Sequence, residues 1–298
     1  MSARSFTAGL AAVVAFTFTP REAEAYCQMT TSEPTSGCAT TGTPLAWKRR
    51  CIEWSLDSRG SSDVPISEVE GAVAASFATW LNVQCDGELP GFEVRESAAF
   101  AECSRSTFDS DGGNVNVIAF VPELDDGPIL ALTTVWYSTS TGEIFDADIL
   151  VNEGQGPFAL CPAVGCLEAD SPHDLTNVLT HEVGHFFGLA HATSSDATMF
   201  ASSRSGETLK RTLSADDEAG FCATYGAQPL PAQCDFEPRG GLDLSCEGGN
   251  RGCAMSPSSL ASRSDPFPLA FLCGVTFVVT LVRRRARGSG SDTLRPRD

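Results

Sequence analysis

Histidine and basic residues are scarce in this sequence. The 298 residues include only four histidines, and 20 Lys and Arg stand against 38 Asp and Glu, which gives a formal net charge of −18. Six of the basic residues follow Val282 and two precede Tyr26, so the stretch from Tyr26 to Asp265 carries 12 bases and 34 acids. Such an acidic body repels nucleic acid and anionic membranes, and it favours neutral or cationic partners and divalent ions.

Apolar runs of the ~20 residues that cross a bilayer comfortably are also missing. A shorter run, Phe6 to Phe18, follows Arg4 and precedes a small-x-small site ending at Ala25, so we predict a secretory signal peptide over residues 1–25. A second run, Phe267 to Val282, precedes an arginine cluster. We predict a transmembrane or sorting helix over 266–282, with a cytoplasmic arginine-rich tail over 283–298.

Paired CxxC spacing is absent as well, so the cysteines are expected to form disulfides rather than to bind metal. Export to an oxidising compartment agrees with this expectation. The sequence alone suggests two local pairs, Cys161 with Cys166 and Cys234 with Cys246. Ten of the twelve cysteines lie in the exported body, namely Cys27, Cys38, Cys51, Cys85, Cys103, Cys161, Cys166, Cys222, Cys234 and Cys246.

Three of the four histidines lie in one stretch, HEVGHFFGLAH, from His181 to His191. Residues four apart share one face of a helix, so His181 and His185 can bind one zinc ion, with Glu182 beside them. Gly188 can adopt the left-handed conformation that ends a helix, which lets His191 return as the third ligand. A lone histidine is usually an ordinary core or surface residue, but this pattern arises by chance on the order of once in a million.

This pattern, HExxHxxGxxH, resembles the zinc motif of the metzincin peptidases. Met199, eight residues after His191, is similarly placed to the Met-turn beneath the zinc of that clan. Leu213 to Gly226 resembles the closing helix of the matrixin branch, so the resemblance covers about residues 45–226. Ala192 and Ala201 depart from the residues that several metzincin subfamilies carry at these positions. With no spare histidine, the second structural zinc of vertebrate matrixins is not expected.

The resemblance implies an α+β fold of the zincin type. A twisted, mixed, mostly parallel sheet would carry two long helices and a zinc cleft, with a small C-terminal subdomain that holds the Met-turn and the closing helix. The sequence pattern agrees, since one helix is expected to begin with Pro65 and a Ser67–Glu70 capping box. A second helix is expected to begin with Ser171 as N-cap. The strands expected from alternating or continuous apolar runs are 47–56, 91–96, 114–121, 131–137 and 143–153.

In matrixin-like enzymes the substrate peptide pairs antiparallel with the edge of the sheet. By this resemblance we place the substrate-binding edge at residues 143–153, which include Ile144, Asp146 and Asp148. The two aspartates lie on the same side of the pleat. Because buried unpaired carboxylates are costly, these two either face water or meet a cation or a donor.

Three further expectations concern residues near the site. The acidic loop Asp109–Gly113 could bind calcium, but ordinary turns use the same residues and it lacks the spacing of an EF-hand. His173 falls outside the metal spacing and is expected to be exposed and not catalytic. The loop from Phe200 to Thr212 is expected to form the wall of the pocket that selects the substrate residue.

The sequence also predicts how the chain divides into segments and where the protein is located. A leader over 26–46, poorly ordered or pinned by a disulfide, precedes the catalytic domain at 47–226, and a Cys-, Pro- and Gly-rich stalk follows at 227–265. Cys38 does not match the cysteine switch of matrixin zymogens. Cys253, before the apolar segment and the arginines, resembles the processing residue of C-terminal sorting signals in Gram-negative surface proteins. We expect a monomer that is exported and either anchored at the cell surface or outer envelope, or released after C-terminal processing.

Zinc held by three neutral histidines keeps one open position, where a water with a lowered pKa becomes a nucleophile. Glu182 would act as general base and then deliver the proton to the leaving nitrogen. The sequence therefore predicts a zinc endopeptidase that acts on proteins or peptides. The alternative is a surface adhesion or binding module that keeps the metal without turnover, although the intact Glu182 argues against it. A zinc hydrolase for non-peptide amides has no supporting feature beyond the shared metal chemistry.

Overall fold

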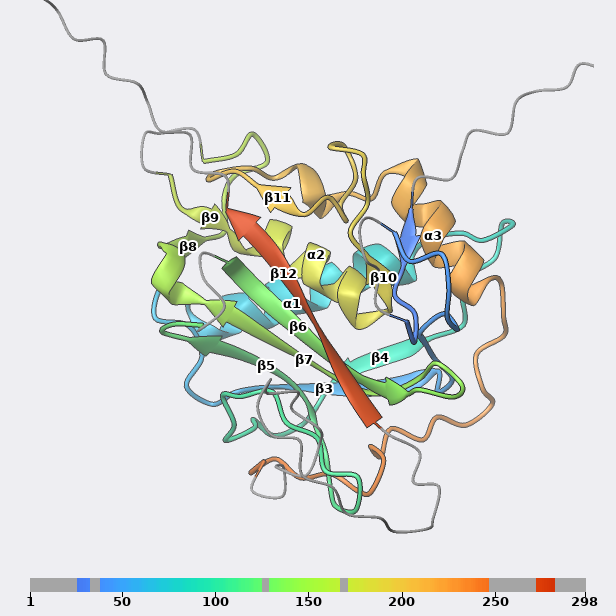
Figure 1. Ribbon diagram of the computed structural model, residues 1–298. Coiled ribbons are helices and arrows are strands. Elements are labelled where there is room, and N and C mark those ends of the chain that lie inside the picture. The colour runs from blue at the N-terminus through green and yellow to red at the C-terminus, as the bar shows by residue number, and fades with distance from the viewer. Residues whose placement is uncertain (1–25, 33–37, 125–128, 167–170, 247–271, 282–298) are drawn as a thin grey trace, which may run out of the picture.

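A computed structural model describes residues 26–32, 38–124, 129–166, 171–246 and 272–281. Its centre is a twisted eight-stranded sheet with the strand order β11-β12-β6-β7-β5-β3-β4, and β2 also pairs with β7 (Figure 1). The strands β3, β4, β5 and β7 run parallel, and β6 is antiparallel to β7. The bounds are β2 Ala46–Trp47, β3 Cys51–Leu56, β4 Glu93–Glu96, β5 Asn116–Val121, β6 Ile129–Ser138, β7 Glu143–Asn152, β11 Ser202–Ser203 and β12 Leu272–Leu281.

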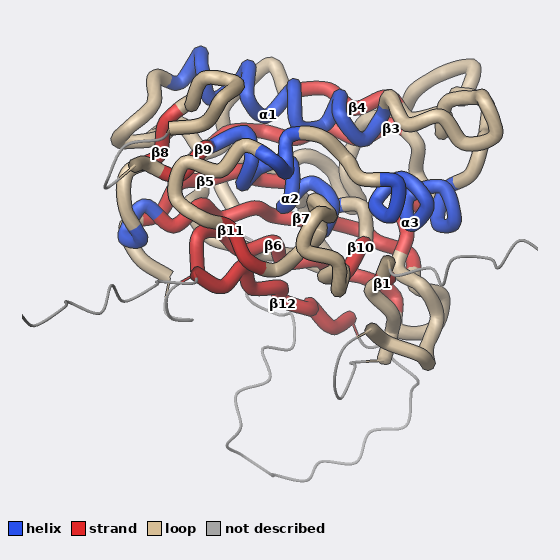
Figure 2. The backbone as a smooth tube through the Cα atoms, turned by 90° about the horizontal axis from the view of Figure 1, so that it is seen from above, coloured by secondary structure: helices blue, strands red, loops and turns tan. Residues whose placement is uncertain are grey.

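Two helices, α1 (Ile66–Leu81) and α2 (Leu175–Phe186), pack against each other over one face of the sheet, as the view from above shows (Figure 2). Phe77 of α1 stacks on Trp54 of β3 at 6.1 Å between ring centroids and meets Phe186 of α2 edge-on at 5.1 Å. These rings form the centre of the main core, and burial of such aromatic surface dominates core energetics. The zinc motif therefore lies on α2, which packs against α1 and against the sheet.

The helix starts differ in part from the expectation. Pro65 occupies the N-cap position of α1 without a side-chain cap, so the predicted Ser67–Glu70 capping box does not form. Asp174, not Ser171, caps α2, and its carboxylate accepts a hydrogen bond from the Asn177 amide at 2.7 Å. An aspartate satisfies the orphan amides of a first turn as well as a serine does, so the pattern alone did not separate the two.

The third helix, α3 (Ala215–Tyr225), begins as predicted. Ser214 and Asp217 form a reciprocal capping box, in which each side chain accepts a hydrogen bond from the other's backbone amide. The buried Phe221 and Tyr225 rings lie 5.0 Å apart and attach α3 to the main core. The predicted closing helix is thereby confirmed in place and in its cap.

The strand order corrects one prediction. Residues 143–153 were expected to form the substrate-binding edge, but β7 lies between β6 and β5 inside the sheet. Ile144, Asp146 and Asp148 are accordingly buried. Gly142 closes a tight β6–β7 hairpin that places β6 outside β7, and a strand's sequence does not state which neighbour it will have.

Residues 272–281 also differ from the expected helix. They form β12, which pairs antiparallel with β6 from Leu272 opposite Ser138 to Thr280 opposite Ile129, and parallel with β11. Val and Thr, which favour extended backbone, make up five of its ten residues. Within the ranges given above, no helix has the length and apolar character needed to cross a bilayer. The membrane or sorting role of 266–282 stays a prediction; residues 1–25 and Cys253 lie outside the described residues.

Five disulfides cross-link the described residues, and one of the two predicted pairs is confirmed. Cys161 pairs with Cys166, whereas Cys234 and Cys246 do not pair with each other. Cys234 and Cys246 each join a residue far away in sequence, so the segment from 227 to 246 is fastened back to the domain, whereas the Cys27–Cys38 bond closes a loop within the leader. The other four bonds are Cys27–Cys38, Cys51–Cys234, Cys85–Cys222 and Cys103–Cys246.

Candidate metal centre

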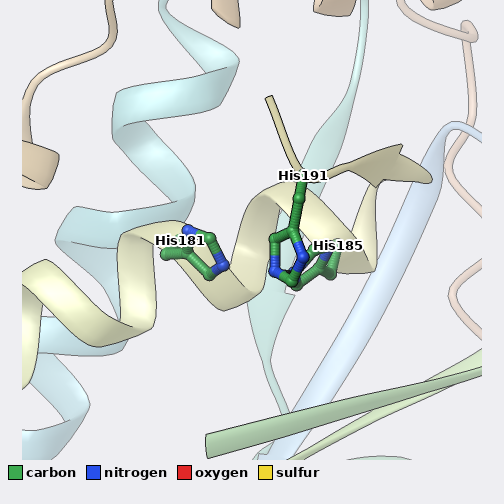
Figure 3. A group of neighbouring side chains, drawn as sticks. All are labelled: His181, His185 and His191. Atoms are coloured by element: carbon green, nitrogen blue, oxygen red, sulfur yellow. Dashed lines mark hydrogen bonds between the residues drawn. The ribbon is translucent and has the colours of Figure 1, made fainter. Parts of the chain in front are cut away.

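The three motif histidines converge on one point, as Figure 3 shows. His181 and His185 lie one turn apart on α2, and one potential ligand atom from each of the three histidines lies within 4.8 Å of the others. The Nε2 atoms of His185 and His191 are 3.1 Å apart. Among the described residues, these three histidines are the group of three or more His, Cys, Asp or Glu side chains whose geometry could hold a metal ion.

Gly188 brings the third histidine back to the helix. Its backbone has a positive φ of 84°, and a Cβ there would collide with the Leu45 carbonyl, so a glycine is required. The chain then forms β10 (Leu189–Ala190), which pairs with β1 (Cys27–Gln28) of the leader. The leader thus supports the turn that carries His191.

Backbone carbonyls fix the orientation of two of the rings. His181 Nδ1 donates to the Thr198 carbonyl at 2.6 Å, and His185 Nδ1 donates to the Leu189 carbonyl at 2.8 Å. A proton on Nδ1 leaves the Nε2 lone pair free for a metal. Among the described residues, His181 Nε2 is buried without a hydrogen-bond partner, which is the state expected of a ligand atom.

Burial controls the charge of the cluster. It lowers the pKa of His181 and His185 well below the ordinary value, and it lowers the pKa of His191 to about 4, with Lys210 acting in the same direction. The histidines are therefore neutral near pH 7, and neutral imidazole is the form that binds zinc. Three neutral nitrogen ligands fit a zinc ion that keeps one position open for chemistry.

Glu182 lies beside these ligands and is fully buried. Its Oε2 accepts a hydrogen bond of 2.6 Å from Thr133 Oγ1 on β6, while its Oε1 has no hydrogen-bond partner in the described part of the chain. Burial raises the pKa of Glu182 to about 8, against the opposing effects of the Thr133 hydrogen bond and of Lys210. A carboxyl group with a pKa near neutrality can both accept and return a proton.

Met199 lies under the ligand helix. A Cβ on Gly184, between the two helical histidines, would collide with Met199 Sδ and the Trp80 ring, so helix and methionine are in close contact. The Thr198 and Met199 amides donate to the two carboxylate oxygens of the buried Asp217 at 2.7 and 3.0 Å. Asp217 therefore ties the methionine turn to α3, a link that its capping role in the sequence did not reveal.

The loop from Phe200 to Thr212 borders a cavity, and its role in selecting the substrate residue stays a prediction. The cavity measures about 510 Å³, and its lining includes Ser195, Asp196, Phe200, Ser202, Ser203, Arg204, Glu207 and Leu209. Lys210, behind this wall, is buried, and its ammonium group donates to the Phe200 carbonyl. Its backbone amide donates to Asn177 Oδ1 of α2 at 2.7 Å, so the wall is fixed to the ligand helix.

Other predicted residues lie away from the centre. His173 was expected to be exposed but is buried against Phe158 in the short β8–β9 pair, Phe158–Ala159 with His173–Asp174. The acidic loop is closed by its own hydrogen bonds, with the Asp111 amide donating to Asp109 Oδ1, and calcium there stays a prediction. Sequence reasoning missed Thr133, because a threonine within an apolar strand carries no distinguishing pattern.

A mostly parallel sheet with an antiparallel β6, a ligand helix, a methionine turn and a closing helix together define a metzincin-type fold. The family model of the matrixins matches residues 46–226. The chain belongs to the matrixin family. It is also similar to two Arabidopsis thaliana proteins, Metalloendoproteinase 1-MMP (45% identity over 56 residues, 19% of this chain) and Metalloendoproteinase 5-MMP (33% over 84 residues, 28% of this chain). The aligned stretches span only 15% and 21% of those two proteins.

Proposed function

We propose that this protein is a zinc-dependent endopeptidase that hydrolyses peptide bonds. One observation carries the proposal: three neutral histidines share a focus, and the buried Glu182 beside them keeps one carboxylate oxygen without a partner. Zinc bound there would polarise the substrate carbonyl and lower the pKa of water. The matrixin family and the two metalloendoproteinase relatives support the same activity.

Residues of the chain account for the remaining steps. Glu182 Oε1 takes a proton from the attacking water and then passes it to the leaving nitrogen. The Thr198 and Leu189 carbonyls hold the His181 and His185 rings with their Nε2 atoms toward the focus. Met199 packs beneath the helix at Gly184, between the positions of the two helical histidines.

The substrate is an extended peptide that pairs with β6. The antiparallel pairing of β12 with β6 supports this, because β12 is itself an extended segment that pairs with the outer side of β6. The cavity next to the Phe200–Thr212 wall would receive a side chain of that peptide. β6 thus replaces β7 as the substrate-binding strand.

The proposed setting is outside the cytoplasm. Five disulfides support export, since such bonds persist in oxidising compartments. Anchoring at the cell envelope, or release after processing near Cys253, rests on the sequence pattern of the C-terminal part alone.

Replacing Glu182 by Gln tests the mechanism. The variant should keep one zinc per chain and lose roughly 10²- to 10⁴-fold in the rate of peptide-library cleavage, the contribution typical of a general base. Glu218→Gln, an exposed change on α3, is the matched control and should cleave like the wild type. Undiminished cleavage by Glu182→Gln would contradict the mechanism. Metal binding without chelator-sensitive cleavage by the wild type would favour the binding-module alternative.

A further inference from the structure

The contact between Thr133 and Glu182 joins two elements far apart in sequence. Thr133 lies on β6, Glu182 lies on α2, and both side chains are fully buried. Thr133 Oγ1 is 2.6 Å from Glu182 Oε2, within the range of a hydroxyl that donates to an ionised carboxylate. The Glu182 main-chain carbonyl lies farther away, at 3.3 Å. A hydroxyl has one proton, so the carboxylate is its better acceptor.

The backbone that carries Thr133 is fixed on both sides. Its Cα is paired with Ile149 of β7 and with Phe277 of β12. A β-branched side chain on such a backbone has few accessible rotamers, so its hydroxyl is a donor held in one place. A glutamate has more rotatable bonds, and a fixed donor at one oxygen selects among its rotamers.

The two carboxylate oxygens of Glu182 consequently differ. Oε2 is held by Thr133, whereas Oε1 has no hydrogen-bond partner among the described residues. We propose that Thr133 is a positioning residue for the general base: its hydroxyl holds Oε2 so that Oε1 is presented to the attacking water and the leaving nitrogen. This inference rests on the proposed peptidase function and adds a residue from the sheet to its machinery.

Thr133→Val tests the proposal because valine keeps the branched shape and removes the hydroxyl. We expect kcat to fall by roughly 10- to 100-fold, the range expected when a reacting group is misaligned, with KM and zinc content close to those of the wild type. Thr133→Ser keeps the hydroxyl and should recover most of the lost rate. Thr79→Val, at a half-buried threonine of α1 whose hydroxyl donates to its own helix, is the control and should leave kcat unchanged.

A double-mutant cycle separates positioning from a general structural effect. In the Glu182→Gln background there is no carboxylate to hold, so Thr133→Val should change the residual rate by less than about 2-fold. A structural defect would instead reduce the rate by the same factor in both backgrounds. Equal factors, or a failure of Thr133→Ser to restore kcat, would overturn the proposal.

Binding of acetohydroxamic acid to the zinc-loaded protein gives a readout that needs no turnover. This compound chelates zinc and transfers its acidic proton to a neighbouring base, so its affinity senses where the carboxylate lies. Calorimetry should find weaker binding to Thr133→Val and wild-type binding to Thr133→Ser. If no variant cleaves peptides but this order of affinities holds, the peptidase proposal fails and the positioning role stands. Equal affinities in all three proteins would overturn the positioning role.

Discussion

Two groups of buried titratable side chains lie on opposite faces of the sheet. The histidines and Glu182 lie on the helix-covered face, whose core includes Ile149 and Val151 of β7. Asp146 and Asp148 share their side of β7 with Leu150, which belongs to the second, smaller hydrophobic cluster. Burial lowers the pKa of the histidines and raises the pKa of both aspartates well above the ordinary range. The same cause therefore favours the neutral form of the histidines and of the two aspartates.

Neutrality has opposite consequences in the two groups. A neutral histidine offers a lone pair to a metal, whereas a neutral aspartic acid has kept its proton. Asp148 also accepts hydrogen bonds from the Thr107 and Val117 amides at 2.9 and 2.8 Å, while both Asp146 oxygens lack partners among the described residues. The difference teaches that burial alone does not make a metal site; ligand atoms must also converge while other contacts fix their orientation.

Removing a ligand should have the largest effect. His185→Ala should lose stoichiometric zinc, because two histidines remain where three protein ligands are needed. His173→Ala, the change at the fourth histidine, should keep one zinc per chain even if it lowers stability. Elemental analysis after dialysis measures both. If both variants lost zinc, or if neither did, the assignment of His185 as a zinc ligand and of His173 as a residue that does not bind zinc would be wrong.

The zinc-free protein should lose stability in acid through its histidines. Their pKa values are lowered in the folded state, so below pH ~6.5 the unfolded chain binds protons that the folded chain does not. The contribution is complete above pH ~6.5 and declines as the pH falls toward about 4, the pKa of His191. We expect a loss of roughly 2 kcal/mol for each histidine of the cluster between pH 7 and 5. Urea unfolding measures it, and His191→Gln should reduce the loss.

Asp146→Asn should have the smallest effect, with the opposite sign. The raised pKa means that ionisation of Asp146 costs stability as the pH rises above its ordinary value of 3.8. An asparagine has no such cost, so the melting temperature at pH 7 should increase by roughly 2–4 °C, about 1 kcal/mol for a domain of this size. Asp148→Asn is the comparison, and it should destabilise because an amide accepts the two backbone donors less well. A lower melting temperature for Asp146→Asn would indicate that a cation holds this carboxylate ionised.

The parts of the fold that were predicted from sequence depend on short-range patterns. The metal cluster needs only one helix and the turn at Gly188, so residues 181–191 were sufficient to place it. The α3 capping box and the Cys161–Cys166 bond are equally local, because their partners lie three and five residues apart.

The parts that were missed depend on contacts between distant segments. Strand order places β7 between β6 and β5 and places β12 on the other side of β6, and that order arises from packing across the whole sheet. The Cys51–Cys234 and Cys103–Cys246 bonds join residues 183 and 143 positions apart. Thr133 meets Glu182 across 49 positions. In each case the residue types were ordinary, and only the fold gave them their neighbours.

The pairing of β12 with both β6 and β11 has a consequence for enzyme assays of the full chain. A strand that is covalently attached to its own domain acts as a tethered competitor at an effective concentration that reaches roughly millimolar for short flexible links. If the substrate pairs with β6 as proposed, a dilute peptide would enter only when β12 detaches, and the apparent KM would measure that detachment as well as affinity. Were residues 266–282 drawn into a lipid bilayer, as their sequence suggests, β12 would be withdrawn and the outer side of β6 would be left open.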